Sequence, residues 1–229
     1  MKSARIQKNG WWRLTLAFHL SAFFLSLTAH AARPFVTDDA RIVDPGGCQV
    51  ETFYKDQRTY AGSEFWFMPA CTPKDLGVEI TAGGNRVEDQ KNAIAQLKFL
   101  LKPLQTNGSG FAVSAGVYGT SPYVNTIASF STLNDRAVFH LNTGAIRDKD
   151  TDSLRNTWGL GLEALLWQPR LYGILETYGI SSEKQTYHYG LRFWIVPNRL
   201  QIDATHGTQG AFDNDPQRRF NSVGLRILW

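Results

Sequence analysis

The feature that most constrains the fold is a repeated segment of about ten residues, in which apolar side chains alternate with small or polar ones before a break rich in Gly, Pro, Asn or Asp. Residues 157–167, TWGLGLEALLW, show the pattern well, with tryptophan, leucine and alanine at every second position. A period of two belongs to a β-strand whose two faces meet different surroundings. In residues 93–102, this period puts Gln96, Lys98 and Lys102 together on the polar face.

About twelve such segments follow one another along the chain, and helical periodicity is hard to find. They are 49–56, 64–70, 76–84, 93–102, 110–118, 124–132, 137–146, 157–167, 171–180, 187–195, 200–207 and 218–229. An even number of antiparallel strands is typical of closed membrane barrels. The chain is therefore predicted to be all-β and to form one folded domain.

The contrast between the two faces indicates what surrounds the sheet. One face is aliphatic and aromatic, whereas the other is rich in Gly, Ala and Ser and carries few charges per strand. A soluble β-sandwich or lipocalin-like barrel would show the same alternation, but lipid outside and a narrow interior fit this contrast better. Because lipid cannot satisfy unpaired backbone groups, strands cross it only as a closed ring. We predict a single closed antiparallel transmembrane β-barrel of about twelve strands.

The connections between the segments alternate in character. Those at 72–75, 133–136, 168–170 and 196–199 are tight, whereas those at 85–92, 147–156 and 208–219 are longer and charged. Outer-membrane barrels have short periplasmic turns and long outer loops. The alternation therefore supports the same fold and gives the barrel a direction.

The N-terminus has the features of a cleavable signal peptide. Residues 1–13 are basic and contain no acid, an apolar run follows, and the tripeptide AHA at 29–31 supplies a cleavage site. A transmembrane anchor is the alternative, but the run is short for a span. We expect a signal peptide over 1–31, a periplasmic or plug segment over 32–47, and the barrel over 48–229.

Removal of the signal peptide changes the charge of the protein. Four of the 24 basic residues and none of the 20 acidic ones lie in residues 1–31, which leaves twenty of each in the remainder. The basic character therefore belongs to the export signal, and binding to nucleic acid is not predicted. The bacterial outer membrane is the expected location, with its lipids as partners.

The C-terminal strand ends on an aromatic residue. Val223, Leu225, Ile227 and Trp229 occupy every second position, and Arg226 lies on the opposite face. This pattern resembles the C-terminal signal that the barrel-assembly machinery recognises in outer-membrane proteins, which makes that machinery an expected partner. Trp229 is then expected at the periplasmic interface. An ordinary terminal strand that happens to end in tryptophan is the alternative.

The chain contains two cysteines, Cys48 and Cys71. If residues 56–62 form the turn between the first two strands, with its centre between Thr59 and Tyr60, the cysteines lie directly opposite each other. Opposed positions on antiparallel strands are within reach of a disulfide. An exported protein passes through an oxidising compartment, so we predict a Cys48–Cys71 disulfide.

The inward-facing charged residues are the candidates for solute selection in the lumen. They are Glu51, Glu163, Glu176, Arg192, Asp203 and Arg226. Hairpin symmetry places Arg192 beside Asp203 and Glu163 close to Glu176, and barrel closure brings Arg226 to Glu51. Such charges gate or select solutes, or they only neutralise one another and hold the interior packed. We favour the second interpretation.

Two histidines, His140 and His188, also face inward and join this set of lumen candidates. Two isolated histidines on distant strands are weak evidence for catalysis or metal binding. The sequence has no GxSxG, HExxH, Walker or dinucleotide-binding motif in a supporting context. We predict no catalytic residue, no metal site and no cofactor.

Both ends of the chain resemble one family. RPFVTDDARIVDPGGCQVETFY (33–54) is similar to the mature start of exported barrel proteins of the MetA-pathway of phenol degradation family. Near the other end, the stretch 196–229 resembles that family's last hairpin, with a Pro-containing turn, an L-Q-hydrophobic-D strand and a V-G-L-R terminus. LYGILETYG resembles an inner strand carrying a glutamate, here Glu176.

The resemblance implies a porin-like outer-membrane transporter that passes small molecules, hydrophobic or aromatic ones among them. We interpret Thr37, Asp38 and Asp39 as part of a polar segment ahead of the first strand, with a plug or cation contact as the alternative. The function classes that remain beside the channel are an outer-membrane lipid-modifying enzyme and a sealed structural barrel. The enzyme would need a Ser–His or acid–His pair at the outer lipid boundary.

Overall fold

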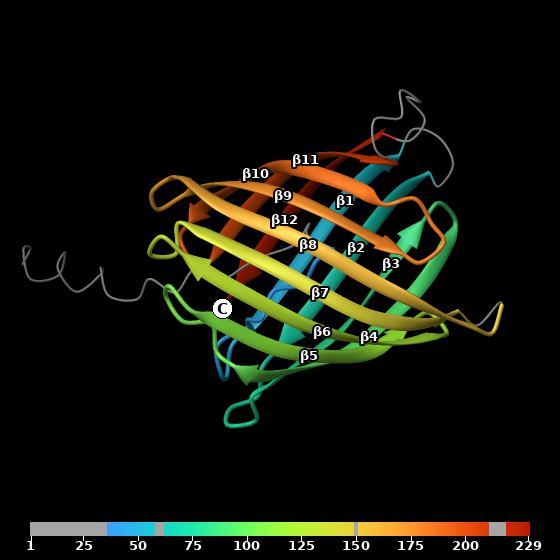
Figure 1. Ribbon diagram of the computed structural model, residues 1–229, viewed down its shortest axis with the longest axis horizontal. Coiled ribbons are helices and arrows are strands. Elements are labelled where there is room, and N and C mark those ends of the chain that lie inside the picture. The colour runs from blue at the N-terminus through green and yellow to red at the C-terminus, as the bar shows by residue number, and fades with distance from the viewer. Residues whose placement is uncertain (1–35, 58–61, 149–150, 211–218) are drawn as a thin grey trace, which may run out of the picture.

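A computed structural model describes residues 36–57, 62–148, 151–210 and 219–229. Within these ranges the chain forms twelve antiparallel strands, each paired with its sequence neighbours, and β1 closes on β12 (Figure 1). The strands are β1 (Cys48–Gln57), β2 (Ser63–Cys71), β3 (Val78–Val87), β4 (Gln90–Lys102), β5 (Ser109–Tyr118), β6 (Ser121–Thr132), β7 (Ala137–Asp148), β8 (Ser153–Trp167), β9 (Leu171–Ile180), β10 (Thr186–Val196), β11 (Leu200–Gln209) and β12 (Arg219–Leu228). This confirms the predicted closed barrel. No helix in the described ranges has the length and hydropathy of a membrane span.

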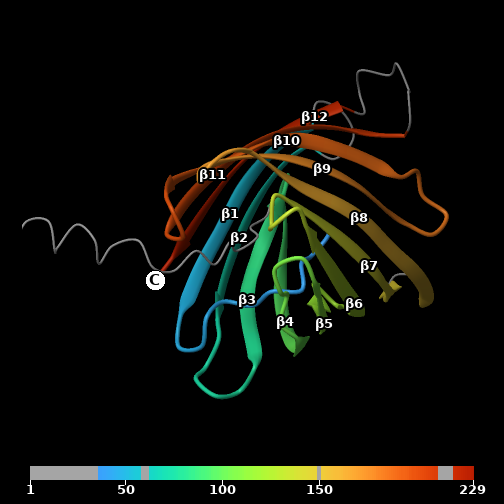
Figure 2. The ribbon, with the colours of Figure 1, turned by 60° about the vertical axis from the view of Figure 1, so that its left-hand side comes forward.

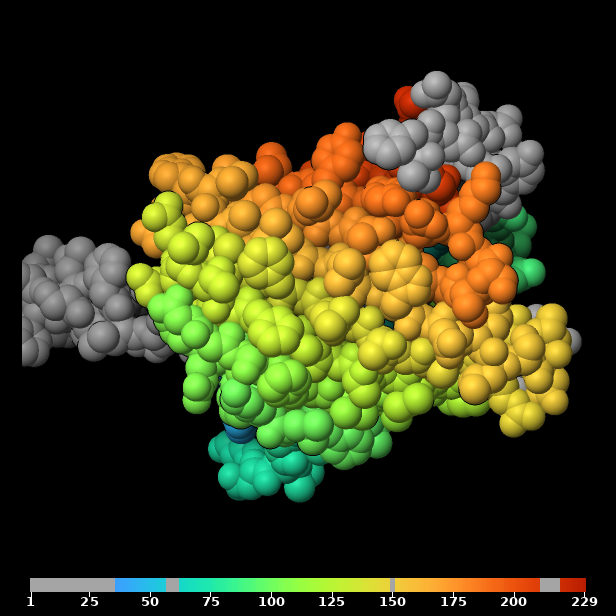
Figure 3. Space-filling model, viewed as in Figure 1, coloured from blue at the N-terminus to red at the C-terminus, as the bar shows by residue number. Residues whose placement is uncertain are grey.

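The apolar face of the strands forms the outside of the barrel. Leu97, Phe139 and Leu191 are 43%, 47% and 50% exposed, whereas Glu163 and Arg192, of the opposite parity, are 5% and 1% exposed. The space-filling view shows the side chains that cover the outer surface of this wall (Figure 3). An apolar exterior around a polar interior is the arrangement of an outer-membrane barrel and excludes the sandwich alternative. The chain is therefore an outer-membrane protein.

The strands extend further than the sequence pattern indicates. Residues 85–92 and 147–156, predicted as long loops, belong mostly to hairpins: β3 and β4 leave only 88–89 between them, and β7 and β8 leave 149–152. Register pairs such as Arg86 with Lys91 continue the ladder through these polar residues. Beyond the membrane both faces of a hairpin meet water, so the alternation disappears although the strand continues. Part of the predicted loop at 208–219 lies outside the described residues.

A β-bulge changes the parity of one predicted inward residue. The register between β4 and β5 shifts between Leu100 and Lys102. Lys98, before the shift, is buried, whereas Lys102 is exposed at the strand end, contrary to the prediction. An extra residue in one strand reverses the faces beyond it.

The β1–β2 hairpin carries the predicted disulfide. Cys48 and Cys71 are register partners and are bonded to each other. Part of the connecting turn, 58–61, lies outside the described residues. Trp229 exchanges two backbone hydrogen bonds with Cys48, at 2.9 and 3.0 Å, so the disulfide, the chain end and the barrel seam meet at one place.

The outer face of β12 has the arrangement expected of an assembly signal. Val223, Ile227 and Trp229 are 61%, 42% and 68% exposed, and Leu225 is half-buried on the same face. These side chains therefore face lipid. Their recognition by the assembly machinery stays a prediction.

Candidate functional site

Residues 36–47, named here the plug segment, turn back from the base of β1 into the space enclosed by the strands (Figure 2). Backbone N–H groups of this segment donate hydrogen bonds to side chains from β3, β6, β7 and β9. The pairs are Val43 to Glu79 (2.9 Å), Ala40 to Ser129 (2.9 Å), Asp38 to Asn142 (2.6 Å), and Thr37 to Glu176. The segment is therefore fixed to the inner wall from several sides, as a bound peptide would be.

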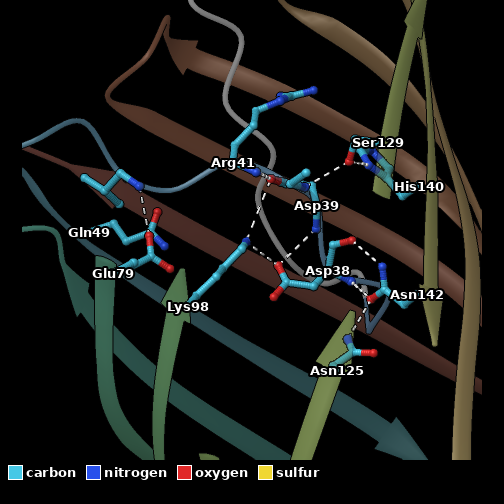
Figure 4. A network of polar contacts seen from close by, with 12 residues as sticks. Asp38, Asp39, Arg41, Gln49, Glu79, Lys98, Asn125, Ser129, His140 and Asn142 are labelled. Atoms are coloured by element: carbon cyan, nitrogen blue, oxygen red, sulfur yellow. Dashed lines mark hydrogen bonds and ion pairs between the residues drawn. The ribbon is translucent and has the colours of Figure 1, made fainter. Parts of the chain in front are cut away.

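Asn142 binds both backbone polar groups of one residue of the plug segment, Asp38. Its Oδ1 accepts the N–H of Asp38, and its Nδ2 donates to the carbonyl of Asp38 at 2.8 Å. Asn125 donates to the same Oδ1 at 3.2 Å (Figure 4). Asn142 therefore binds the plug segment through backbone groups, and these hydrogen bonds do not depend on the side chain of Asp38.

The acidic side chains of the plug segment meet a buried lysine. Lys98 Nζ lies 2.8 Å from Asp38 Oδ1 and 4.0 Å from Asp39 Oδ1, and the lysine side chain is 4% exposed (Figure 4). Burial opposes ionisation of Asp39, but the positive charges of Lys98 and Arg41 hold the pKa of Asp39 below its ordinary value. Asp39 is therefore an anion in its bound position at neutral pH.

These contacts change our interpretation of Thr37, Asp38 and Asp39. The sequence favoured a polar segment ahead of the first strand, whereas the described residues 37–43 lie within the barrel. Parity placed Lys98 on the inner face, but nothing in the sequence showed its partner. The anchoring residues Glu79, Ser129 and Asn142 were not among the predicted site residues.

All six predicted inward charges are buried inside the barrel. The exposed fractions are 7% for Glu51, 5% for Glu163, 2% for Glu176, 1% for Arg192, 2% for Asp203 and 4% for Arg226. Arg192 contacts Asp203 at 2.9 Å and Glu163 at 2.5 Å. Arg226 lies 3.5 Å from Glu51 across the seam, where the two residues are register partners.

The two glutamates predicted to lie close together have separate roles in this network. Glu163 is the register partner of Ile174, and Glu176 is the partner of Gly161. Glu163 belongs to the ion pair with Arg192, whereas Glu176 accepts the N–H of Thr37 and lies 3.1 Å from His188 Nδ1. The first therefore balances charge within the wall, and the second holds the plug segment.

His140 and His188 are both buried on the inner side, next to residues that anchor the plug segment. His140 Nδ1 lies 2.9 Å from Ser129 Oγ, and His188 bridges Glu176 and Thr205. The Ser–His pair of His140 and the acid–His pair of His188 thus lie inside the barrel. No group of three or more His, Cys, Asp or Glu side chains in the described part of the chain is arranged to hold a metal ion.

A cavity of about 890 Å³ lies between the plug segment and the outer rim of the barrel, and we call it the vestibule. Its lining includes Thr37, Lys55, Glu64, Trp66, Tyr118, Tyr178 and Phe220. Trp66 stacks on Phe53 at 5.3 Å and on Tyr118 at 5.9 Å between ring centroids. A recess of about 220 Å³, lined by Tyr118 and Tyr123 among others, reaches Asp38.

Charged groups accompany these aromatic rings. Lys55 Nζ lies 3.2 Å from Glu64 Oε1 and 4.4 Å from the ring centroid of Phe220. The indole N–H of Trp66 donates to Glu64 at 2.9 Å. The vestibule therefore presents aromatic surface beside paired opposite charges.

The family model described as "Uncharacterised conserved protein UCP029691" matches residues 20–221. The chain belongs to this family. Its description differs from that of the MetA-pathway family that the two end motifs resemble. No curated protein sequence matches the chain.

Solved structures of outer-membrane porins and channels share the fold. A KdgM porin has a TM-score of 0.60 at 8% identity, covering 78% of this chain and 98% of the porin. A NanC porin has a TM-score of 0.57 at 11% identity, covering 79% and 98%. The COG4313 outer membrane channel from Pseudomonas putida F1 has a TM-score of 0.54 at 11% identity, covering 87% and 100%. At these identities the likeness establishes a common barrel fold.

Proposed function

We propose that the chain is an outer-membrane channel for small molecules, in which the vestibule receives a solute from outside and the plug segment controls its passage to the periplasm. The observation that carries the proposal is the meeting of the two features at Thr37, which belongs to the plug segment and lines the vestibule. The segment is held by hydrogen bonds and one ion-pair cluster, which are reversible contacts. A wall of paired strands would be far harder to open.

The vestibule supports small aromatic or hydrophobic molecules as the solutes. Trp66 and Tyr118 line the vestibule and stack on each other, and Phe53 stacks on Trp66. Aromatic rings favour contact with other rings and with apolar groups. The resemblance to the MetA-pathway family points to the same class of solute. The structural neighbours, by their names, are porins and channels.

The test compares the full chain with a variant that lacks residues 36–43, each reconstituted into planar bilayers. We expect small or rare current steps from the full chain and larger, sustained steps from the deletion variant, because the barrel ladder does not include these residues. A heated-versus-unheated gel comparison checks that both barrels are closed. If a folded deletion variant gives no current, the channel proposal is wrong and the sealed structural barrel replaces it.

Solute preference is tested by swelling of liposomes that contain the deletion variant. We expect benzyl alcohol to enter faster than an aliphatic alcohol of similar size, and Trp66→Ala to remove most of this difference. Phe139→Ala is the matched control, because Phe139 is an aromatic residue on the lipid-facing side. If Trp66→Ala and Phe139→Ala change the entry rates equally, the vestibule does not determine the preference for aromatic solutes.

A further inference from the structure

The recess of about 220 Å³ lies between the vestibule and the plug segment, and the side chain of Asp38 forms part of its wall. The recess and the vestibule share five lining residues, which are Val36, Trp66, Tyr118, Asn125 and Thr157. The two spaces therefore adjoin, and a solute that has entered the vestibule is at the mouth of the recess.

Aromatic and aliphatic side chains, Ile94, Tyr118 and Tyr123 among them, form most of the wall of the recess. The hydroxyl of Tyr123 donates to Gln96 Oε1 at 2.6 Å, and the hydroxyl of Tyr118 accepts a hydrogen bond from Asn85 at 2.9 Å. Because both phenol oxygens are bonded to wall residues, the two rings offer carbon surface to a solute. The volume of the recess is below the range of about 300–1,000 Å³ that is usual for drug-sized ligands, so the recess suits a single ring.

A carboxylate position lies next to this apolar recess, on the periplasmic side of the two tyrosines. Ser114, which lines the recess, is the register partner of Lys98, and Lys98 Nζ lies 2.8 Å from Asp38 Oδ1 (Figure 4). Asp39 lies 4.0 Å from the same Nζ, and Glu79 is the register partner of Lys98 on β3. A buried cation that loses an anionic partner is strongly destabilised. Asp38 therefore leaves Lys98 at little cost only if another carboxylate takes its place, which keeps the charge of the cluster unchanged.

We propose that Lys98 and the recess form a binding site for small aromatic carboxylates, and that Asp38 occupies the carboxylate position of this site while the plug segment is bound. The carboxylate of the solute replaces that of Asp38 on Lys98, and its ring lies in the recess. Solute and plug segment therefore exclude each other, so the solute releases the segment that blocks its own path. The binding site follows from the contacts above, whereas the opening of a pore on release rests on the proposed channel function.

The first test measures binding of radiolabelled benzoate in detergent by equilibrium dialysis, after a heated-versus-unheated gel comparison has shown that each barrel is closed. The variant that lacks residues 36–43 should bind benzoate more tightly than the full chain, because no internal carboxylate competes. In this deletion variant, Lys98→Met should weaken binding roughly 10- to 100-fold, the range for a hydrogen bond to a charged group. Lys91→Met, at the exposed outer end of the same strand, should leave the affinity unchanged. Benzamide, which has the ring without the charge, and acetate, which has the charge without the ring, should each displace benzoate poorly.

The second test asks whether Asp38 and the solute compete. In the full chain, Asp38→Asn should bind benzoate more tightly than the unsubstituted protein does, because the competing charge is gone. Asp44→Asn, which removes an exposed carboxylate of the same segment, is the matched control and should leave the affinity unchanged. In planar bilayers, benzoate should raise the open fraction of the full chain, whereas benzamide at the same concentration should not.

The outcomes separate this inference from the channel proposal. If the deletion variant conducts but benzoate binds no better than benzamide, or binds equally well after Lys98→Met, the carboxylate site is wrong and the channel proposal stands. If benzoate binding depends on Lys98 but the deletion variant gives no current, the site stands and the channel proposal is wrong. If the deletion variant conducts and benzoate does not raise the open fraction of the full chain, the proposed competition with the plug segment is wrong.

Discussion

Replacement of Lys98 by methionine should release the plug segment while leaving the barrel closed. The ammonium group of Lys98 lies between Asp38 and Asp39, and Glu79 is its register partner on β3. Without the positive charge, three carboxylates remain close together. Loss of one partner of a buried ion pair costs about 3–5 kcal/mol. The Asp38 side chain is 14% exposed, so the pair is not fully buried. We therefore take the lower limit of this cost, about 3 kcal/mol.

A change of about 3 kcal/mol corresponds to a shift of roughly 100-fold in the equilibrium between the bound and released plug segment. In planar bilayers, Lys98→Met should therefore spend a much larger fraction of time open than the full chain does. Lys91→Met is the matched control, because Lys91 lies on the same strand but is exposed at its outer end. If Lys98→Met opens no more often than the Lys91 control, while the 36–43 deletion conducts, the ion pair does not hold the plug segment.

Three further predictions concern the contact between Gly159 and the plug segment, the ionisation of Asp39, and the Cys48–Cys71 disulfide at the start of β1. A Cβ at Gly159 would lie 2.6 Å from Thr37 Oγ1, so Gly159→Ala should raise the open fraction, whereas Gly173→Ala, where the nearest side-chain atom is 3.4 Å away, should not. The pKa of Asp39 is lowered when the plug segment is bound, so the contribution of Asp39 to binding is present above the ordinary pKa of about 3.9 and is lost as the pH falls below it. The fraction of time that the channel spends open should therefore increase in this acidic range. The increase should be smaller in Asp39→Asn. Replacing Cys48 and Cys71 by serine should lower unfolding stability by about 3 kcal/mol, seen as unfolding at lower urea concentration in detergent; an unchanged midpoint would contradict the cross-link estimate.

Much of the barrel could be predicted because a strand has only two faces and a hairpin has one centre. Once a turn is placed, the residues on either side are paired, which gave Cys48 with Cys71 and Arg192 with Asp203. The same logic failed at Lys102, because a bulge of one residue leaves no mark in the alternation. It also failed where polar hairpins project into water.

The position of the plug segment could not be predicted for a different reason. Residues 36–47 have no period, and their partners Glu79, Lys98, Ser129 and Asn142 come from two separate strand pairs, β3–β4 and β6–β7, which surround one segment only when the sheet has curled into a ring. Each partner taken alone is an ordinary inward polar residue. Their common role depends on closure, which places positions far apart in sequence around one segment.

The plug segment is continuous with β1 through Gly46 and Gly47, whose N–H groups are bonded to Thr72 and Asp44. After it dissociates it remains tethered within a few residues of its seat, so rebinding is a unimolecular event. A short flexible tether typically corresponds to a millimolar effective concentration. A solute that competes for the same contacts must therefore be abundant or bind tightly, and closure of the pore after the solute leaves requires no second molecule.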